Sequence, residues 1–338
     1  MSLPSVFNRY RSELERELGT AISTEAFPLH AMMRYHLGWE DEHGEPCQVH
    51  GGKHLRSVLC LAACEATGGD WHSALPAAAA LELVHNFTLI HDDIQDNSVQ
   101  RRHRPTVWSI WGIAHGINAG DGMWAAAQLE LLRLQQHGVS SQKVVTASHA
   151  LGETCLKLCE GQYLDMSFEN SLDIDIDNYL SMIDRKTAQL FSCSLFLGAL
   201  TGTDNQDLIS KFACFGREIG MAFQIHDDVL GIWGDEENTG KSTYTDIRER
   251  KKTLPIVYTL QNAHGADKEK LVSLYSHAEV STDDANQVLR VLDTVGAKKF
   301  TEEYRSRYCT QALKTLENMD ISQHSMYQLR DVVTYMLQ

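Results

Sequence analysis

Proline is scarce in this chain. Only 6 of the 338 residues are proline, and the stretch from Thr106 to Leu254 contains none. Proline interrupts helices, because its ring clashes with the preceding turn and it lacks a backbone donor. Runs that alternate polar and apolar residues, as half-buried strands do, are also few. These two deficits favour long helices and argue against a β-protein.

Basic residues are fewer than acidic ones, at 30 against 45, which gives a formal net charge of −15. Because binding a polyanion requires a basic surface, we expect no nucleic-acid partner. No uninterrupted run of about 18 apolar residues is present, and charges are spread through Met1 to Thr20. We therefore expect no membrane span and no signal peptide, and a cytoplasmic protein.

Apolar residues recur at three- and four-residue intervals in several long segments, the pattern of helices with one buried face. The apolar content of 43% is ample for a core. We predict one all-α domain over residues 1–338, a helical bundle with a central active-site cavity. The clearest predicted helices are Ala74 to His91, Gly120 to Gln136, Lys143 to Met166, Ile176 to Leu200, Asp207 to Leu230 and Leu254 to Asn262.

Two acidic clusters each follow an apolar helical stretch. The first contains Asp92, Asp93 and Asp96, and the second contains Asp227 and Asp228. Such a cluster can be a helix cap or a solvated acidic face, but the preceding apolar residues place these acids near the ends of buried helices. Crowded carboxylates repel one another unless cations lie between them. Oxygen ligands without thiolates suit Mg²⁺, so we expect both clusters to form one magnesium site.

Basic groups accompany the acids. Gly52 lets a backbone approach an anion, and we expect Lys53 and Arg56 on the first turn of the helix that follows. Arg101 and Arg102 follow the first cluster closely. Either set alone could be an ordinary turn or a solvated face, but together they suit a diphosphate. Further polar candidates are Lys186, Thr187, Gln224, Lys241, Asp246 and Lys251, the last three in or just after a predicted functional loop, Gly234 to Arg250.

Seven motifs, in order and spacing, resemble the trans-isoprenyl diphosphate synthases. They cover Gly51 to Pro255, and seven ordered motifs are far more specific than any one of them. The segments are Gly-Gly-Lys-His-Leu-Arg (51–56), Leu-Ile-His-Asp-Asp-Ile-Gln-Asp with Arg-Arg-His-Arg-Pro-Thr (89–106), Gly-Gln-Tyr-Leu-Asp (161–165), Lys-Thr (186–187), Phe-Gln-Ile-His-Asp-Asp (223–228), Gly-Lys-Ser-Thr-Tyr-Thr-Asp (240–246) and Lys-Lys-Thr-Leu-Pro (251–255).

The resemblance implies a helical fold of the terpenoid-synthase type. It also implies a homodimer that condenses isopentenyl diphosphate with an allylic diphosphate, using about three Mg²⁺ ions per active site. By motif, Asp92, Asp96 and Asp227 would hold the ions, with Asp93, Asp228 and Asp246 as further ligands or in support. The allylic diphosphate would bind Arg101, Lys186, Gln224, Lys241 and Lys251, while Gly52, Lys53, Arg56, His85 and Arg102 would bind isopentenyl diphosphate. Lys186, Thr187 and Gln224 would also offer a carbonyl or dipoles to the allylic cation.

The chain departs from the pattern of this family in four places. Gly231 stands where many relatives carry a third aspartate in the second cluster. His54 replaces a frequent arginine, Ser57 a common proline and His103 a frequent glycine. The first change removes one possible metal ligand, so we expect the second cluster to depend chiefly on Asp227.

Product length should depend on what closes the cavity below the first cluster. On a helix Phe87 lies about 7.5 Å below Asp92, Thr88 one turn below it, and Val84 a further turn down. A lone aromatic at the Phe87 position resembles geranylgeranyl diphosphate synthases, whereas an aromatic pair resembles farnesyl diphosphate synthases. We therefore expect a C20 product, unless Phe87 is only a core aromatic. Met123, Trp124 and Leu129 could instead close the tunnel or form a dimer interface.

Three rival interpretations remain. A class I terpene cyclase shares the fold but needs no isopentenyl diphosphate pocket, which Lys53, Arg56 and Arg102 supply here. A non-catalytic subunit of a heteromeric synthase would be expected to lose aspartates, which this chain keeps. A helical magnesium-dependent phosphohydrolase would not need the ordered basic motifs.

Overall fold

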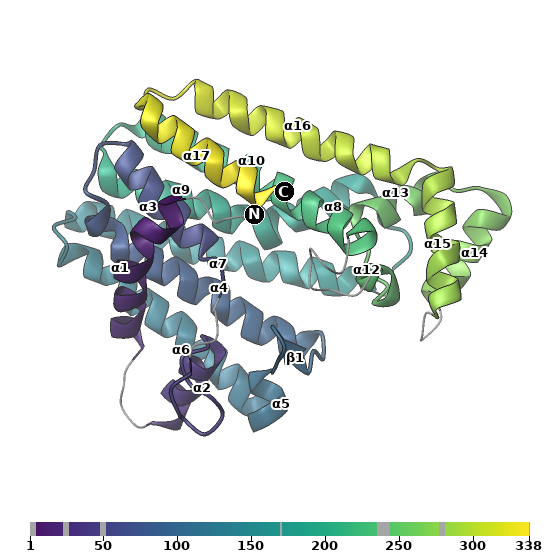
Figure 1. The fold of residues 1–338 in the computed structure, drawn as a ribbon, viewed down its shortest axis with the longest axis horizontal. Coiled ribbons are helices and arrows are strands. Elements are labelled where there is room, and N and C mark those ends of the chain that lie inside the picture. The colour runs from purple at the N-terminus through teal and green to yellow at the C-terminus, as the bar shows by residue number, and fades with distance from the viewer. Residues whose placement is uncertain are drawn as a thin grey trace. The chain divides into compact units, whose positions relative to one another are not determined.

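The protein is helical almost throughout (Figure 1), in a computed structural model that describes residues 5–22, 27–47, 52–169, 171–234, 244–276 and 281–337. This confirms the predicted all-α class. The elements are α1 (Ser5–Ala21), α2 (Pro28–His36), α3 (Leu55–Ala66), η1 (Trp71–Ala74), α4 (Leu75–Gln95), β1 (Gln100–Arg101), β2 (Arg104–Pro105), α5 (Val107–Trp111), α6 (Ile113–Leu132), η2 (Arg133–Gln135), α7 (Ser141–Glu169), α8 (Ile176–Ile183), η3 (Asp184–Ala188), α9 (Gln189–Gly202), α10 (Gln206–Trp233), α12 (Thr245–Arg248), α13 (Leu254–Asn262), α14 (Gly265–Ser276), α15 (Thr282–Thr294), α16 (Ala297–Glu317) and α17 (Gln323–Met336).

The predicted helices are confirmed with shifted ends, apart from one. Helix α13 has the predicted bounds, and α7 extends its predicted segment at both ends. Helix α4 begins one residue later than predicted and continues beyond His91 to Gln95. The continuous helix predicted from Ile176 to Leu200 is wrong, because a π-helix, η3, separates α8 from α9. The loop predicted from Gly234 to Arg250 contains the short helix α12, and its residues 235–243 lie outside the described ranges.

The chain forms two compact units. Unit 1 comprises residues 1–153, 193–213 and 320–335, and unit 2 comprises residues 154–192, 214–319 and 336–338. The first acidic cluster belongs to unit 1 and the second to unit 2. A single domain over 1–338, a central cavity and one metal site built from both clusters therefore stay predictions.

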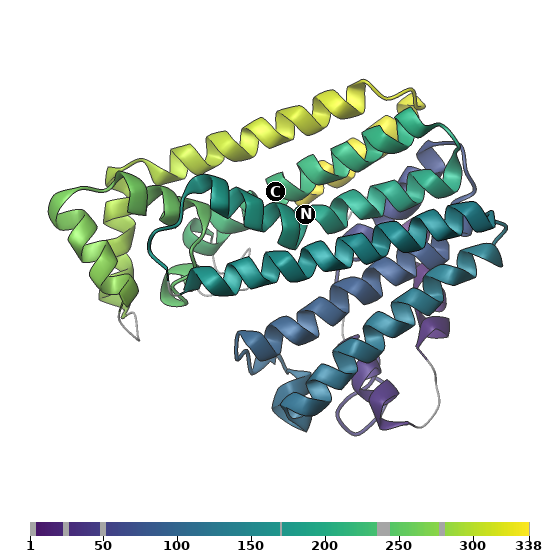
Figure 2. The ribbon, with the colours of Figure 1, turned by 180° about the vertical axis from the view of Figure 1, so that it is seen from behind.

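In unit 1, α4 and α6 lie side by side (Figures 1 and 2). Two glycines of α6, one turn apart, permit this closeness. A Cβ atom at Gly120 would overlap the imidazole of His91, and one at Gly116 would press on Ile94.

The segment Trp71–Gln95 is long and apolar enough to cross a membrane, but 78% of its apolar window is buried inside the protein. Burial in the core accounts for that apolar character.

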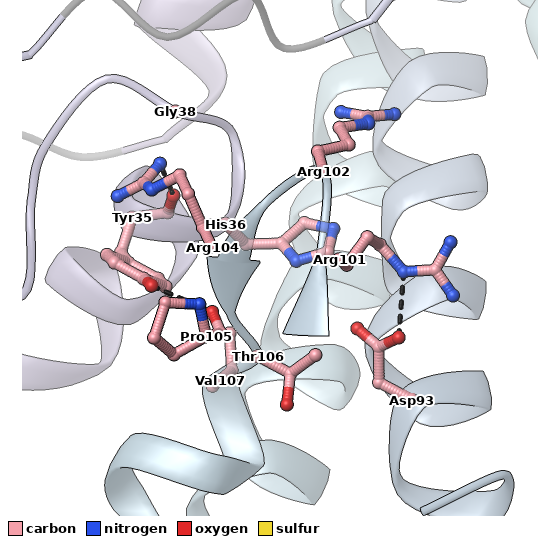
Figure 3. Close-up of a pocket in the computed structure, with 10 residues that line it drawn as sticks. All are labelled: Tyr35, His36, Gly38, Asp93, Arg101, Arg102, Arg104, Pro105, Thr106 and Val107. Carbon is pink, nitrogen blue, oxygen red and sulfur yellow. Dashed lines mark hydrogen bonds and ion pairs between the residues drawn. The ribbon is translucent and has the colours of Figure 1, made fainter. Parts of the chain in front are cut away.

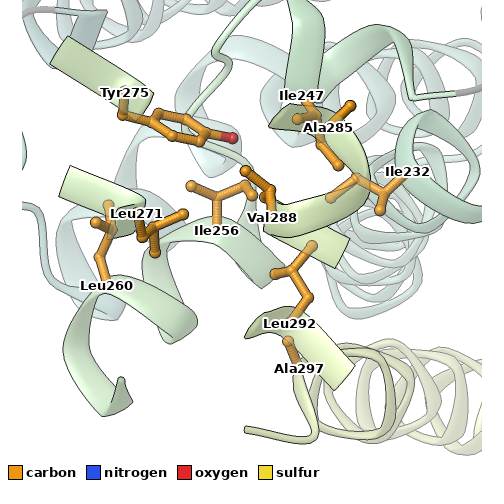
Figure 4. Packing of buried hydrophobic residues seen from close by; sticks show 10 residues of the cluster. All are labelled: Ile232, Ile247, Ile256, Leu260, Leu271, Tyr275, Ala285, Val288, Leu292 and Ala297. Atoms are coloured by element: carbon orange, nitrogen blue, oxygen red, sulfur yellow. The ribbon is translucent and has the colours of Figure 1, made fainter. Parts of the chain in front are cut away.

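Unit 2 has its own apolar core around α13, α14 and α15 (Figure 4). Ile256 of α13, Leu271 of α14 and Val288 of α15 are buried together there, and Ile247 of α12 joins them. Figure 2 shows α14 and α15 packed as a helical hairpin. This core anchors α12, the helix that carries Asp246.

Candidate active site

The first acidic cluster lies at the carboxyl end of α4. Asp92 and Asp93 are in its last turn, and Asp96 caps it with a backbone hydrogen bond of 2.8 Å to the Asp92 carbonyl. That turn contains no basic residue. The carboxyl end of a helix carries partial negative charge, so three carboxylates there raise the electrostatic cost. A bound cation would relieve it.

Asp93 faces inward. It is 1% exposed, and burial raises the pKa of its carboxyl to about 6, although Arg101 acts against this shift. The Arg101 Nε donates to Asp93 Oδ1 at 2.7 Å, while Oδ2 is buried and makes no hydrogen bond. Asp93 therefore positions the Arg101 side chain. This role agrees with the expectation that Asp93 supports the magnesium site and that Asp92 and Asp96 are its main ligands.

A two-stranded hairpin brings the arginines to the acids. Strands β1 and β2 pair antiparallel with Arg101 opposite Arg104. Arg102 and His103 form the turn, and both have left-handed backbones, with φ of 52° and 61°. Such a turn favours glycine, so Arg102 and His103 hold a backbone conformation that is uncommon for residues with side chains. The turn directs Arg102 away from the acids.

Gly52 and Arg102, predicted to share a ligand, are in contact. Gly52 has φ of 128°, and a Cβ atom there would lie 3.0 Å from Arg102 Nη2. Arg56 is on the first turn of α3 as predicted, but the placement of Lys53 on that turn is wrong. His54 has a left-handed backbone, so the helix begins only at Leu55. Lys53 is exposed, with its Nζ 5.0 Å from the ring centroid of Tyr335.

His85 lies on α4 beside these cations. Burial lowers the pKa of its imidazole well below the ordinary value, and Arg56 and Arg102 lower it further. The ring is therefore neutral. A neutral imidazole can donate a hydrogen bond to an anion without adding charge to an already cationic site.

A pocket beside the hairpin contains residues that the sequence did not indicate (Figure 3). His36 of α2 points among the arginines, and burial, with Arg102 and Arg101, lowers the pKa of its ring to about 3. The guanidinium of Arg104 stacks on Tyr35, 4.1 Å from the ring centroid. No motif could reveal this, because α2 lies more than sixty residues before the hairpin.

The second cluster divides into an exposed and a buried carboxylate. Asp227 is exposed, whereas Asp228 is 2% exposed. Asp228 accepts hydrogen bonds from the Leu254 backbone N–H at 3.0 Å, from Gln224 Nε2 at 3.2 Å and from the Tyr179 hydroxyl. Burial raises the pKa of Asp228 to about 7 in spite of these donors. Asp228 therefore ties α10 to α8 and α13 and leaves Asp227 as the outward carboxylate.

The π-helix η3 presents Lys186 and Thr187. Thr187 Oγ1 donates to Gln224 Oε1 at 2.7 Å, and Lys186 forms an ion pair with Asp165 of α7. Gly161 of α7 lies directly against the Lys186 backbone, where a Cβ atom would overlap it. One-turn π-bulges often mark functional sites, because they shift the backbone out of the regular ladder. Here the bulge joins Thr187 to Gln224 and Asp228 in one chain of hydrogen bonds.

Gly231 is in contact with Asp246. A Cβ atom at Gly231 would overlap the Asp246 carboxylate, and would lie 3.0 Å even from its farther oxygen. Asp246, from α12, is 7% exposed. Its carboxylate thus occupies the space beside Gly231 in which a third aspartate of the cluster would begin.

Two predicted residues have less support. Lys241 lies outside the described residues. Lys251 is exposed, and its Nζ is 2.9 Å from Glu249. Within the described ranges, no group of three or more His, Cys, Asp or Glu side chains is arranged as a finished metal site.

Phe87 is buried against α6. Its ring centroid is 5.7 Å from that of Trp124 and 5.7 Å from that of His91. Thr88 Oγ1 donates to the His85 carbonyl at 2.7 Å, and Val84 is fully buried. The three other candidates for closing the tunnel lie in different surroundings. Met123 is buried and Trp124 contacts Phe87. Leu129 is 68% exposed, so it does not close a tunnel within this chain.

Comparison with known proteins defines the class. The (2E,6E)-farnesyl diphosphate synthase of Mycobacterium tuberculosis is 38% identical over 90% of this chain and 85% of its own length. A geranylgeranyl diphosphate synthase of that organism is 38% identical over 86% of this chain and 82% of its own. The crystal structure of a polyprenyl synthetase from Streptomyces coelicolor A3(2) matches with a TM-score of 0.90 at 33% identity, covering 99% of each chain.

These similarities, with the helical fold and the two acidic clusters, identify a prenyl-transferring enzyme of the helical class. The polyprenyl synthetase family model matches residues 42–292, and the chain belongs to that family. It is a short-chain trans-prenyl diphosphate synthase, as the motifs indicated. Since farnesyl and geranylgeranyl enzymes are equally identical to it, overall similarity does not decide the product.

Proposed function

We propose that this prenyltransferase extends allylic diphosphates with isopentenyl diphosphate as far as geranylgeranyl diphosphate, a C20 product. The observation that carries this proposal is the single bulky ring of Phe87 on α4, held by Trp124, with the small Thr88 next to it. A ring fixed by packing can stop a growing chain at a defined depth, because displacing it would disrupt a well-packed core. A farnesyl product, C15, is the alternative.

Magnesium suits the residues of both clusters. Asp92, Asp96 and Asp227 are the proposed ligands, with Asp93, Asp228 and Asp246 in support. The fit rests on the chemistry of the donors, which are carboxylate oxygens, and on the buried Asp93 oxygen that makes no hydrogen bond. Bound magnesium would neutralise charge on the departing diphosphate.

The chain's own residues have distinct tasks. Arg101, Lys186, Lys241 and Lys251 bind the allylic diphosphate and neutralise its oxygens as the carbon–oxygen bond breaks. Thr187 and Gln224, aligned by their 2.7 Å hydrogen bond, direct dipoles toward the allylic cation. Preorganised dipoles need no rearrangement during the reaction, which is why they stabilise such a cation efficiently.

Isopentenyl diphosphate binds Gly52, Lys53, Arg56, His85 and Arg102 in this proposal. The contact between Gly52 and Arg102 and the neutral state of His85 support it. The isopentenyl double bond attacks the cation and forms the new carbon–carbon bond. The adduct then loses a proton to the released diphosphate, so no side chain need act as a dedicated base.

A homodimer in the cytoplasm is the proposed state of the enzyme. Helix α6 exposes four large apolar side chains, Ile113, Ile117, Leu129 and Leu132, which are 44% to 68% exposed. Several exposed apolar side chains along one helix suit contact with a second copy of the same chain.

Two assays distinguish this proposal from a class I terpene cyclase on the same fold. The protein is incubated with Mg²⁺ and C5, C10 or C15 allylic diphosphates, with and without labelled isopentenyl diphosphate, and dephosphorylated products are separated by chromatography. We expect longer linear products only when isopentenyl diphosphate is present. A cyclic hydrocarbon from an allylic diphosphate alone would support the cyclase.

A further inference from the structure

A buried carboxylate lies beneath the basic groups proposed to bind isopentenyl diphosphate. Glu82, on α4, is 3% exposed and belongs to none of the motifs described above. An isolated buried charge is costly, so a carboxylate in this position requires partners. The partners of Glu82 connect it to the basic segment before α3.

Both oxygens of this carboxylate are engaged. Oε1 lies 3.2 Å from His54 Nδ1 and accepts from Asn86 Nδ2 at 3.2 Å. Oε2 accepts from Ser57 Oγ at 3.1 Å. Two of these partners, His54 and Ser57, are positions at which this chain departs from its family. The departures therefore meet at one carboxylate.

Glu82 is ionised. Burial alone would raise the pKa of its carboxyl, but His54 and Arg56 bring the pKa below its ordinary value. In return the charge of Glu82 acts on the Arg102 guanidinium and on His54, whose pKa it raises against the effect of burial. The buried carboxylate of Glu82 thus supplies one negative charge to the cationic groups of His54, Arg56 and Arg102.

The backbone at His54 needs support. Its left-handed conformation, with φ of 49° and ψ of 35°, is uncommon and unfavourable for a residue with a side chain. Such strain persists when surrounding contacts hold it. The contact with Glu82 holds the His54 side chain, and the turn at His54 determines where Gly52 and Lys53 lie before the helix begins.

We propose that Glu82 is a positioning residue for isopentenyl diphosphate: its carboxylate holds His54, and thereby the Gly52–Lys53 backbone, and supplies the inner counter-charge for Arg56 and Arg102. The inference rests on the proposed binding role of this basic cluster. Glu82 touches no substrate and acts through its neighbours. The allylic diphosphate, bound by other residues, should not depend on it.

The Glu82→Gln variant tests this inference, because glutamine keeps the shape and can keep the Ser57 contact while losing the charge. We expect the KM for isopentenyl diphosphate to rise about tenfold or more, because the variant loses the ion pair with His54. The KM for the allylic substrate should stay within about twofold of the wild type. Calorimetric titration with isopentenyl diphosphate alone, without Mg²⁺, should show the same weakening.

Two further variants separate positioning from general damage. His54→Gln should reproduce the effect, His54→Arg should recover much of the affinity by restoring a cation, and the double variant Glu82→Gln/His54→Gln should be no worse than either single one. Glu65→Gln is the matched control. Glu65 lies at the carboxyl end of α3, away from the basic groups, and pairs with Arg9 and Tyr10 of α1.

Equal rises in both KM values, additive effects of the two substitutions, or an unchanged KM for isopentenyl diphosphate would overturn the inference. In those cases a wild-type enzyme that elongates normally would leave the proposed function intact. A wild-type protein that forms no elongated product would instead refute the proposed function itself.

Discussion

At the scale of single residues, the contact of Gly231 with Asp246 shows what accompanies glycine at a position where the motif would have a third aspartate. An aspartate at position 231 would place a third carboxylate on the same helix as Asp227 and Asp228. Here the neighbouring space is filled by the carboxylate of Asp246, which comes from α12. The loss of one carboxylate along the sequence is therefore accompanied by the approach of another in space.

Gly231→Ala should lower kcat by about tenfold or more, because the new methyl group must displace the Asp246 carboxylate. The Mg²⁺ concentration needed for half-maximal activity should rise with it. Gly152→Ala is the matched control, since a Cβ atom at that helical glycine meets no neighbouring atom. Equal effects of the two substitutions would contradict the importance of the Asp246 position.

Phe87→Ala should shift the products beyond C20, because the ring proposed to limit chain growth is removed. The products are compared by chromatography after dephosphorylation. Phe212→Leu, at another fully buried aromatic, controls for lost stability and should not change product length. An unchanged chain length in Phe87→Ala would reject Phe87 as the stop.

Residues with a strong motif could be predicted from sequence, and residues with only a spatial role could not. Asp92, Arg101 and Gln224 were indicated because spacing and residue type carry their chemistry. Glu82 and His36 were not, since their significance comes from partners far away in the sequence: Glu82 lies 28 residues from His54, by their numbers. Glycine at 231 suggested a missing ligand, but its contact with Asp246 required the structure.

At the scale of helices and turns, local backbone geometry accounts for the errors of the sequence-based predictions. Periodicity cannot show that His54 adopts a left-handed conformation and delays α3, or that η3 interrupts a regular apolar pattern. The π-helix depends on the close approach of Gly161, a tertiary contact. Long helices such as α7 and α10 were predictable, because their apolar spacing is sustained over many turns.

An ion cluster joins α1, α6 and η2 and should make stability depend on pH. Arg133 Nη1 lies 2.8 Å from Glu130 and 3.1 Å from Glu17. Burial, with the neighbouring carboxylate of Glu17, raises the pKa of Glu130 from 4.5 to about 7. The folded protein therefore binds the Glu130 proton more tightly than the unfolded chain does. The contribution of this proton to the free energy of unfolding is complete below pH 4.5 and is lost as the pH rises through about 7.

Glu130→Gln removes this titration. Relative to the wild type, the variant should gain thermal stability as pH rises from about 5 to about 8, because the wild type must then bury a second carboxylate charge. Thermal unfolding followed by circular dichroism at several pH values measures the difference in Tm. A difference that does not change with pH would refute this assignment.

At the scale of the whole molecule, the exposed apolar side chains of α6 lead to a prediction about the proposed dimer. The double variant Ile117→Asp/Leu129→Lys should convert a dimer into monomers, since charges cannot be buried in an apolar interface without partners. Light scattering after size-exclusion chromatography reports the mass. Tyr327→Lys, at an equally exposed apolar residue on α17, is the control and should leave the mass unchanged.

The most direct test of the central claim is the chain length of the final product. Wild-type protein is incubated with Mg²⁺, a C15 allylic diphosphate and an excess of labelled isopentenyl diphosphate, and the dephosphorylated products are separated against standards. A single addition, giving C20 as the end product, is the predicted result. Failure to extend the C15 substrate, or continued growth well beyond C20, would contradict the proposal that Phe87 sets the length of the chain.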